Sequence, residues 1–216
     1  MSTSDYLARV YRSEGGPVHE MNPTFLIEKI LRERIVECAY WKEQCFGLNA
    51  ASLVDRAVQI QCIGGQSSHQ RPTEFICLVY KLLQLAPEDE IVLQYLNATE
   101  FKYLRAIAAF YIRLVWKDAR VFETLEPLLN DYSKLRTLDM NGYGLTHMDE
   151  YVDALLNEQR VCDIALPPLM SRIQLEDLEE LEPKESDDES EEEDDDEQKD
   201  QDESGRSTLN RETKPH

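Results

Sequence analysis

Apolar residues recur at intervals of three and four positions along most of the chain, which is the period of an amphipathic α-helix. The first such segment covers residues 22–48. Asn22 is a favourable N-cap, because its side-chain oxygen can accept a hydrogen bond from a backbone N–H of the first turn. Pro23 suits the first helical position, where no donor is needed, and Gly47 is typical of a helix end. The sequence therefore predicts a helix over residues 22–48. Its apolar face holds Ile27, Leu31, Ile35 and Cys38.

The same period predicts further helices. The segment over residues 72–85 is apolar around most of its circumference, so we expect it to be the most buried helix. Pro127 removes a backbone donor and should bend or end another helix, with residues 128–135 as a bent second half. Residues 140–146 are rich in glycine and asparagine and predict a turn-rich loop, with a short β-hairpin as the alternative. The remaining expected helices cover residues 50–61 (capped by Asn49), 87–97, 100–116 (capped by Thr99), 118–126, 147–160 and 167–181.

Strand signals are weak in this chain. No long run of alternating apolar and polar residues occurs, residues 66–71 are expected to be a loop, and no internal repeat of about 20–50 residues is visible. A body of about 160 residues can bury around 70% of its unfolded surface, which is enough for one core. The predicted fold class is therefore all-α, with a single compact domain of seven to nine helices.

Charge divides the chain into parts. The net charge is −20, and most of it comes from residues 176–203, which hold 19 acidic and two basic residues. Residues 1–175 hold 23 acidic and 18 basic residues. A segment so acidic cannot bury enough apolar surface to offset an ordering entropy of ~1–2 kcal/mol per residue. We expect a flexible arm over residues 1–21, a helical domain over residues 22–183 and a disordered acidic tail over residues 184–216.

Membrane and disulfide signals are also weak. The polar N-terminus lacks the apolar run of a secretory signal, and the longest apolar stretches are far shorter than the ~20 residues of a membrane span. The five cysteines are odd in number and occur in helical apolar patterns, which favours reduced thiols over a disulfide framework. The sequence predicts a soluble intracellular protein.

Motifs for catalysis or cofactor binding are not found. Neither of the glycine-rich nucleotide-binding patterns occurs. Several side chains could in principle ligate a metal, but none forms a C-x-x-C pair, and helix packing explains them better. A nucleophilic cysteine would need a partner histidine, and His147 is better explained as a helix start. We therefore predict no enzyme, no metal site and no cofactor. The metal-ligating types considered are Cys38, Cys45, Cys62, His69 and Cys77.

Arginine and lysine residues are interleaved with aromatic residues, a pattern that also occurs in proteins that hold single-stranded RNA. The body, however, is net acidic, whereas dedicated nucleic-acid binders are usually basic. Helix packing and intrahelical ion pairs explain most of this pattern. The exposed aromatic residues would be the best anchors for partner proteins. The candidates are Tyr40, Trp41, Tyr103 and Trp116, each of which helix-core spacing also explains.

The acidic tail has two interpretations. Charge runs usually keep a protein soluble, and the alternative is weak, salt-sensitive attraction of basic protein segments. Ser186 and Ser190 are each followed by three acidic residues, the pattern that an acid-directed kinase such as casein kinase two prefers. Each phosphate would add about −1.5 to −2 charge. We predict that both serines are phosphorylated.

Several stretches of sequence resemble the pre-mRNA-splicing factor 38 family. They occur in the family's order and together cover about residues 22–183. The resemblance implies a helical domain and a non-enzymatic spliceosome component in the nucleus that acts as a scaffold around tri-snRNP association and spliceosome activation. The stretches are NPTFLIEKILRERI, AYWKEQCFGL, RPTEFICLVYKLLQL, EFKYLRAIAAFYIRL, LEPLLNDYSKLR and HMDEYVDALLNEQRVCDIALP.

The resemblance also implies partners. They are the tri-snRNP, a small zinc-finger splicing protein and a microfibrillar-associated-protein-like factor, with RNA contact at most indirect and no small-molecule substrate. The chain departs from many animal members, which carry a long arginine-serine-rich C-terminus, because only Arg206-Ser207 follows the acidic run here. Three hypotheses follow: a spliceosomal scaffold, a helical RNA-binding module that uses the interleaved basic and aromatic residues, and a cryptic enzyme.

Overall fold

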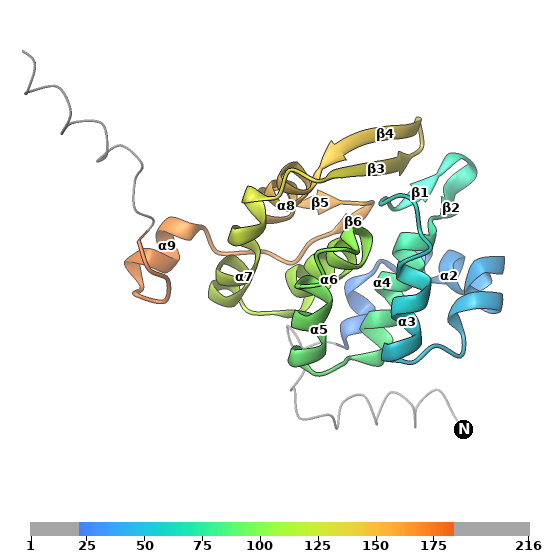
Figure 1. Ribbon diagram of the computed structural model, residues 1–216, viewed down its shortest axis with the longest axis horizontal. Helices are drawn as coiled ribbons and strands as arrows, with labels where there is room; N and C mark the ends of the chain where they lie inside the picture. Colours follow the sequence, from blue (N-terminus) through green and yellow to red (C-terminus); the bar gives the residue numbers. More distant parts are fainter. Residues whose placement is uncertain (1–21, 184–216) are drawn as a thin grey trace, which may run out of the picture. The chain divides into compact units, whose positions relative to one another are not determined.

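The computed structural model describes residues 22–183, and residues 22–181 lie within one compact unit. The predicted helical fold is confirmed, with three small antiparallel hairpins added within the described residues (Figure 1). The helices are α2 (Lys29–Glu37), α3 (Ala50–Ala57), α4 (Glu74–Leu85), α5 (Asp89–Leu96), α6 (Lys102–Val115), α7 (Asp118–Leu125), α8 (Met148–Asn157) and α9 (Arg172–Asp177). The hairpins are β1 (Gln66–Ser67) with β2 (Arg71–Pro72), β3 (Lys134–Asp139) with β4 (Gly142–His147), and β5 (Arg160–Val161) with β6 (Ile164–Ala165).

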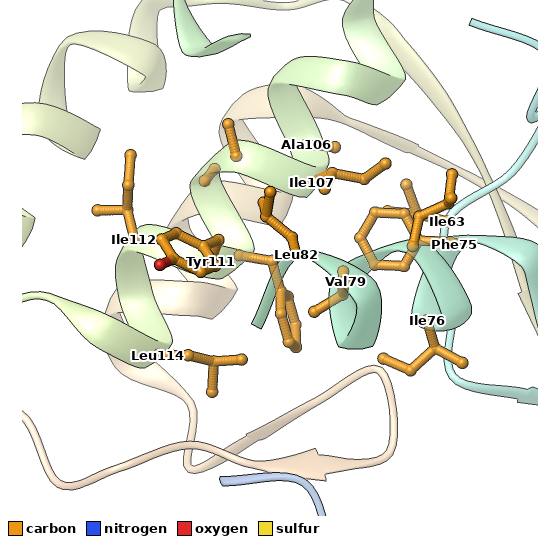
Figure 2. Packing of buried hydrophobic residues seen from close by; sticks show 14 of the residues in the cluster. Ile63, Phe75, Ile76, Val79, Leu82, Ala106, Ile107, Tyr111, Ile112 and Leu114 are labelled. Carbon is orange, nitrogen blue, oxygen red and sulfur yellow. The ribbon is translucent and has the colours of Figure 1, made fainter. Parts of the chain in front are cut away.

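Helices α4 and α6 form the centre of the core. Thr73 caps α4 by accepting a hydrogen bond from the Ile76 N–H, and all but the ends of this helix are buried, as its apolar sequence predicts. The Phe75 ring of α4 meets the Phe110 ring of α6 edge to face, with centroids 6.0 Å apart. Figure 2 shows side chains of α4 and α6 interleaved in this region. Both helices are apolar on most sides, and other elements of the domain cover these sides.

The first apolar segment is not one helix, so the prediction for residues 22–48 is wrong in its continuity. Asn22 does accept from the Thr24 N–H, but it caps only a 3-10 turn, η1 (Pro23–Leu26). After α2 the backbone becomes extended at Cys38 (ψ 150°), and a short π-helix follows, η2 (Trp41–Cys45). This break lets the Trp41 ring pack on Tyr80, with centroids 5.1 Å apart. Core packing therefore divides a segment whose hydrophobic period is nearly continuous.

The region after Pro127 also differs from the helical expectation. A 3-10 turn, η4 (Glu126–Asn130), ends the helix, and β3 and β4 then form the hairpin that was the alternative for residues 140–146. The turn follows local chemistry, since Asp139 Oδ1 accepts from the N–H groups of Asn141 and Gly142. The strands lack apolar alternation because Leu135 is the one fully buried residue of this hairpin. Because most of the hairpin is solvated, the period of apolar residues does not reveal its strands.

Several predicted boundaries need correction. Asn49 caps α3 as expected, but Thr99 does not cap α6, which begins two residues later with Phe101 at the N-cap position. Helix α8 ends at Asn157, before the expected residue 160, because the chain turns into β5. The last helix is shorter than residues 167–181, since Ser171 rather than the prolines caps α9. The loop expected at residues 66–71 is the small hairpin β1–β2 around a 3-10 turn, η3 (Ser68–Gln70).

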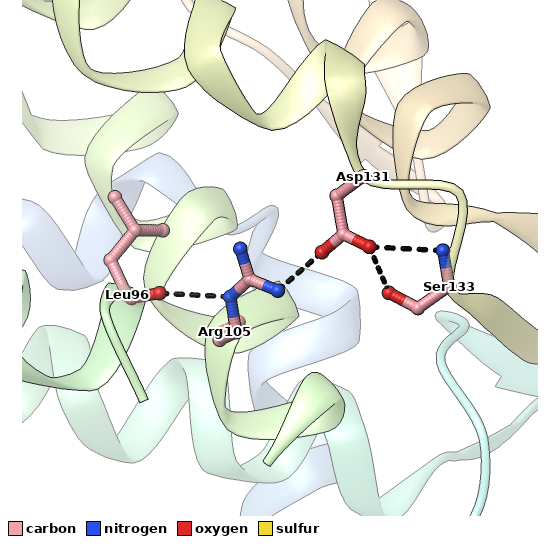
Figure 3. A network of polar contacts seen from close by, with 4 residues as sticks. All are labelled: Leu96, Arg105, Asp131 and Ser133. Carbon is pink, nitrogen blue, oxygen red and sulfur yellow. Dashed lines mark hydrogen bonds and ion pairs between the residues drawn. The ribbon is translucent and has the colours of Figure 1, made fainter. Parts of the chain in front are cut away.

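A polar network fastens β3 to the helices (Figure 3). Arg105 of α6 donates from Nε to the Leu96 carbonyl at 2.9 Å and forms an ion pair with Asp131. Asp131 in turn accepts hydrogen bonds from the backbone N–H of Ser133, at 2.9 Å, and from its hydroxyl. Burial raises the pKa of Asp131, but the Ser133 hydrogen bonds and the Arg105 charge outweigh it, so the pKa lies below its usual range.

This network predicts a pH-dependent contribution to stability. A carboxyl whose pKa is lowered on folding stabilises the fold above its unfolded pKa of ~3.9, and the contribution is lost as the pH falls through the folded value. We expect Asp131→Asn to lower the free energy of unfolding by about 1 kcal/mol at pH 7 and by less below pH ~4. Urea unfolding between pH 3 and pH 7 measures this, with the exposed Asp55→Asn as control. A loss of unfolding free energy in Asp131→Asn that stays constant between pH 3 and pH 7 would contradict this prediction.

Candidate protein-interaction surfaces

The four aromatic candidates lie in different environments. Trp41 and Trp116 are buried, with 5% and 6% of their surface exposed, and both belong to the main core. Tyr40 is half-buried, and burial raises the pKa of its phenol. The Tyr103 hydroxyl donates to the Gln61 carbonyl at 2.7 Å. Their role as partner anchors stays a prediction, and the packing explains at least the two tryptophans.

Most of the interleaved cations already have partners within the fold. Arg113 is buried and donates to two backbone carbonyls, while Arg105 pairs with Asp131. The guanidinium of Arg120 lies 3.8 Å from the Trp116 ring centroid and pairs with Asp89. These contacts hold elements together, which is the helix-packing explanation of the pattern. The basic and aromatic residues therefore do not need RNA to account for them.

The β3–β4 hairpin presents one solvated face. Residues opposite each other in an antiparallel pair point to the same side, and successive residues along a strand alternate sides. Leu135 points inward, so the positions next to it along β3, and the β4 residues paired with those positions, point outward. Tyr143 and Leu145 are 72% and 66% exposed. The Arg136 guanidinium lies 5.8 Å from the Tyr143 ring centroid. The hairpin face, as we call it, consists of Lys134, Arg136, Leu138, Tyr143 and Leu145.

The hairpin also has an open edge. Ile63 extends it on the β3 side, where its N–H donates to the Arg136 carbonyl and its carbonyl accepts from the Leu138 N–H, each at 2.8 Å. Within the part of the chain that the structure describes, nothing extends it on the β4 side. An edge strand can accept a further strand from a partner. The hairpin thus offers both a side-chain face and a backbone edge.

A second surface lies on α2. A shallow pocket of ≈ 380 Å³ is bordered by Val36 of α2 and Tyr80 of α4, with charged side chains around them. Val36 is 43% exposed, and Ile30 on the flank of the same helix is 64% exposed. The α2 face, as we call it, comprises the pocket residues Lys29, Arg32, Glu33, Val36, Glu37 and Tyr80. An apolar floor with a charged rim is typical of a small protein-interaction site.

A third surface lies around α9. Leu175 of this helix packs with Phe122 and Leu181 in a small separate cluster. On other sides of the segment, apolar residues face solvent, with Ile173 71% exposed. The α9 face, as we call it, consists of Met170, Ile173 and Leu178. Such exposure on a short helix is unusual unless a partner covers it.

A groove beside the hairpin has acidic walls. It encloses ≈ 380 Å³ between Gly64-Gly65, β3, α8 and the β5–β6 turn. Asp139, Glu150, Glu158 and Asp163 line it, and Arg160, the one cation of its lining, pairs with Glu28. This surplus of negative charge disfavours a phosphate backbone and suits a basic side chain.

The remaining predictions concern metal sites, membrane spans and the two ends of the chain. Among residues 22–183 no three His, Cys, Asp or Glu side chains are arranged to hold a metal ion. None of the helices in this range has the length and apolar content needed to cross a bilayer. Ser186, Ser190, the arm over residues 1–21 and the tail over residues 184–216 lie outside the described residues. The proposed phosphorylation and the domain boundaries therefore stay predictions.

Sequence reasoning missed the three exposed faces. Their exposed apolar residues are few and separated in the sequence, and only the structure shows that they face solvent. The one available signal was Tyr143 and Leu145 in a glycine-rich stretch, where apolar residues have little local reason to occur.

Comparison with known proteins gives a consistent relationship. The PRP38 family pattern matches residues 16–179. The chain is 67% identical over 183 residues to pre-mRNA-splicing factor 38 of Schizosaccharomyces pombe, covering 85% of this chain and 87% of that protein. It is 45% identical over 171 residues to human pre-mRNA-splicing factor 38A, covering 78% of this chain and 55% of that protein. The chain thus spans about half the length of the vertebrate relatives.

A solved structure agrees with the sequence relationship. It is a crystal structure of the Snu23-Prp38-MFAP1(217-258) complex of Chaetomium thermophilum, matched at 51% identity with a TM-score of 0.75 over 77% of this chain and 88% of that chain. At this identity the likeness reflects common descent as well as a common fold. The resemblance drawn from the helical segments is therefore confirmed, and the chain belongs to the PRP38 family of pre-mRNA-splicing factors.

Proposed function

We propose that this chain is a nuclear spliceosome scaffold whose helical domain holds two or more splicing proteins on separate faces. PRP38 family proteins are splicing factors without enzymatic activity, so the chain is not an enzyme and works through binding. In line with the family resemblance, we place its action around tri-snRNP association and spliceosome activation. The partners we propose are a zinc-finger protein similar to Snu23 and a protein similar to MFAP1, which accompany the Chaetomium relative in its crystal structure.

The separation of the three exposed apolar faces is the observation that supports this proposal. α2, the β3–β4 hairpin and α9 occupy different regions of the domain (Figure 1). Each face carries at least one apolar side chain with 43% or more of its surface exposed. Isolated exposed apolar residues are ordinary, but clusters on three separate elements are costly to leave in water. Several partners can therefore bind without competing for one surface.

The faces differ in the kind of segment each suits. The open β4 edge can pair with an extended segment, while Tyr143 and Leu145 contact alternate side chains of the added strand. The pocket of the α2 face suits a helix or loop that inserts one apolar residue beside Val36 and Tyr80. Ile173 and Leu178 suit packing against a second amphipathic helix. Distinct recognition modes on one domain fit a platform for different partners.

Paired substitutions test this arrangement. Tyr143→Ala with Leu145→Ala truncates the hairpin face, and Ile173→Ala with Leu178→Ala truncates the α9 face. We expect each pair to weaken binding of one partner at least about tenfold and to leave the other partner bound, because interface anchors of this size contribute on the order of 1.4 kcal/mol or more. Calorimetric titration of the full-length chain with each purified partner measures both affinities.

The matched control is Val58→Ala, an exposed apolar residue (47%) outside all three faces, which should change neither affinity. The melting temperature should stay unchanged in all variants, since the altered side chains lie at the surface. If both double variants and Val36→Ala bind both partners as the unaltered chain does, the proposed faces are not the interfaces.

The RNA-binding alternative rests on one part of the surface. Lys102 lies 5.3 Å from the Tyr103 ring centroid, and Arg136 lies over Tyr143 nearby in the same hairpin region. Treating the assembled complexes with nuclease separates the two functions. Under the scaffold proposal, partners remain bound after nuclease and in moderate salt. Loss of the partners together with the RNA, and a weaker salt dependence for Arg136→Ala, would favour the RNA-binding alternative.

A further inference from the structure

Two cysteine sulfur atoms that are far apart in sequence lie in contact. Cys38 follows the end of α2, Cys77 lies in the middle of α4, and their Sγ atoms are 3.7 Å apart. Figure 1 shows α2 and α4 as neighbours in this part of the domain. All the cysteines in the described residues are reduced. The splicing function assigned above does not use this contact.

The two thiols have unequal surroundings. Cys38 is partly exposed, whereas Cys77 is completely buried. The hydrogen bond with Cys77 lowers the pKa of Cys38 to about 6, and the Trp41 N–H, 3.4 Å from its Sγ, acts in the same direction. The same hydrogen bond, together with burial, raises the pKa of Cys77. The sulfur that solvent can reach is therefore the one whose surroundings favour the thiolate.

We propose that Cys38 and Cys77 are an oxidation site, in which a peroxide converts the pair into a disulfide that joins α2 to α4. The assignment rests on the contact between the two sulfur atoms and on their difference in exposure. A thiolate, rather than a thiol, is the nucleophile toward peroxide, so Cys38 reacts first. Cys77 is shielded from the oxidant and acts as the resolving thiol.

The two steps balance as ordinary thiol chemistry. The Cys38 thiolate attacks an oxygen of hydrogen peroxide, so an S–O bond forms and the O–O bond breaks. The departing hydroxide takes up the proton that the Cys38 thiol had released and leaves as one water. Cys38 is now a sulfenic acid, oxidised by two electrons. The Cys77 sulfur then attacks the Cys38 sulfur, the S–O bond breaks and the departing hydroxide takes the Cys77 proton as a second water. The sum is two thiols and one peroxide giving one disulfide and two waters.

The backbone around Cys38 permits the small movement required. The sulfur atoms must come closer by about 1.7 Å, from 3.7 Å to the ~2.0 Å of a disulfide bond. Cys77 is fixed within a buried helix, but Cys38 lies in the extended break between α2 and η2. The partly exposed Cys38 side chain is the one that has room to move. The disulfide would then restrain α2, which carries the α2 face.

Limited peroxide treatment of the full-length chain tests the proposal. We expect the number of free thiols, measured after denaturation, to fall from five to three, and peptide mapping to find the Cys38–Cys77 cross-link. A reducing agent should restore all five. In Cys77→Ser, Cys38 should instead accumulate as a sulfenic acid that a dimedone probe traps. Retention of all five free thiols, or over-oxidation of Cys38 without a cross-link, would overturn the proposal.

Three further variants keep the test decisive if Cys77→Ser folds poorly. Cys38→Ser alters a partly exposed residue and should abolish the cross-link. Cys45→Ser and Cys62→Ser remove the thiols that could compete, and each should retain it. Amide hydrogen exchange of α2 should become slower on oxidation of the unaltered chain and not of Cys38→Ser. A cross-link that joins Cys38 to Cys45, or one that disappears in Cys62→Ser, would refute the assignment.

Discussion

Phe110→Ala is expected to lower the free energy of unfolding by about 3–5 kcal/mol. Phe110 is fully buried in α6, and its ring meets Phe75 of α4 at an interplanar angle of 85°. Truncation removes one of the two largest fully buried side chains, at the contact between the two central helices, and leaves a cavity that rigid helices fill only in part. The aromatic pair adds about 0.5–1.5 kcal/mol beyond the buried area, which is lost as well.

Chemical denaturation followed by circular dichroism measures this loss, and Phe46→Ala is the matched control. Phe46 has the same side chain but is 78% exposed, so its truncation should change stability by no more than about 0.5 kcal/mol. Domains of this size have a total stability of about 5–15 kcal/mol. A loss below about 1 kcal/mol for Phe110→Ala would mean that α4 and α6 do not form the centre of the core.

Arg113→Ala is expected to lower the free energy of unfolding by about 2–5 kcal/mol. Arg113 is 4% exposed, and its Nε donates to the Leu155 carbonyl at 2.7 Å. Its Nη2 donates to the Pro167 carbonyl at 2.8 Å. These bonds join α6 to α8 and to the segment before α9. Burial lowers the pKa of the guanidinium, and the variant would leave two carbonyl groups without their donors.

Thermal and urea unfolding of the variant measure the effect, with Lys117→Ala as control. Lys117 is exposed and belongs to the same interleaved basic and aromatic pattern, so its removal should have little effect on stability. Arg113→Lys should lose part of the stability, because one ammonium does not reproduce the planar pair of donors. If Arg113→Ala unfolds as the unaltered chain does while RNA binding weakens, the structural role given to Arg113 is wrong.

The helices with strong local signals were predictable. Asn49 caps the helix that follows it, as expected, and this signal involves residues only three positions apart. α4 was correctly identified as the most buried helix from its apolar composition alone. Helix starts without a local cap, such as α6 at Phe101, were misplaced because packing rather than a side-chain hydrogen bond sets them.

The extent of the hairpins was the main structural omission, since only a short hairpin over residues 140–146 was considered, as an alternative to a loop. β3 pairs with β4 next to it, but its other edge bonds to Ile63, more than 70 residues earlier. A contact of that separation leaves no periodic trace in either segment. Gly64 shows the same dependence, since its backbone lies so close to the Leu138 carbonyl that a side-chain Cβ would be 2.0 Å from that oxygen. The need for glycine there follows from the neighbour, not from the local sequence.

The candidate aromatic anchors show how far the sequence can predict functional residues. Trp41 and Tyr143 are both large aromatic residues, yet Trp41 is buried and Tyr143 is 72% exposed. The sequence named the first and not the second, because helical spacing marks Trp41 while the flanking turn makes Tyr143 inconspicuous. Exposure depends on what covers a residue, and covering residues come from distant segments.

The sequence by itself determined the helical class, the cap of α3 at Asn49, the absence of recognised catalytic motifs and, through the order of its matching segments, the family. These properties depend on neighbouring residues or on the sequence of whole segments. Only the tertiary structure decided where α2 breaks, which cations are structural, which apolar residues remain exposed and that Cys38 meets Cys77. The physical reason is that side-chain burial, the pairing of cations and the contact between thiols each depend on two segments that meet in the fold. The hydrophobic period of one segment carries no information about the other.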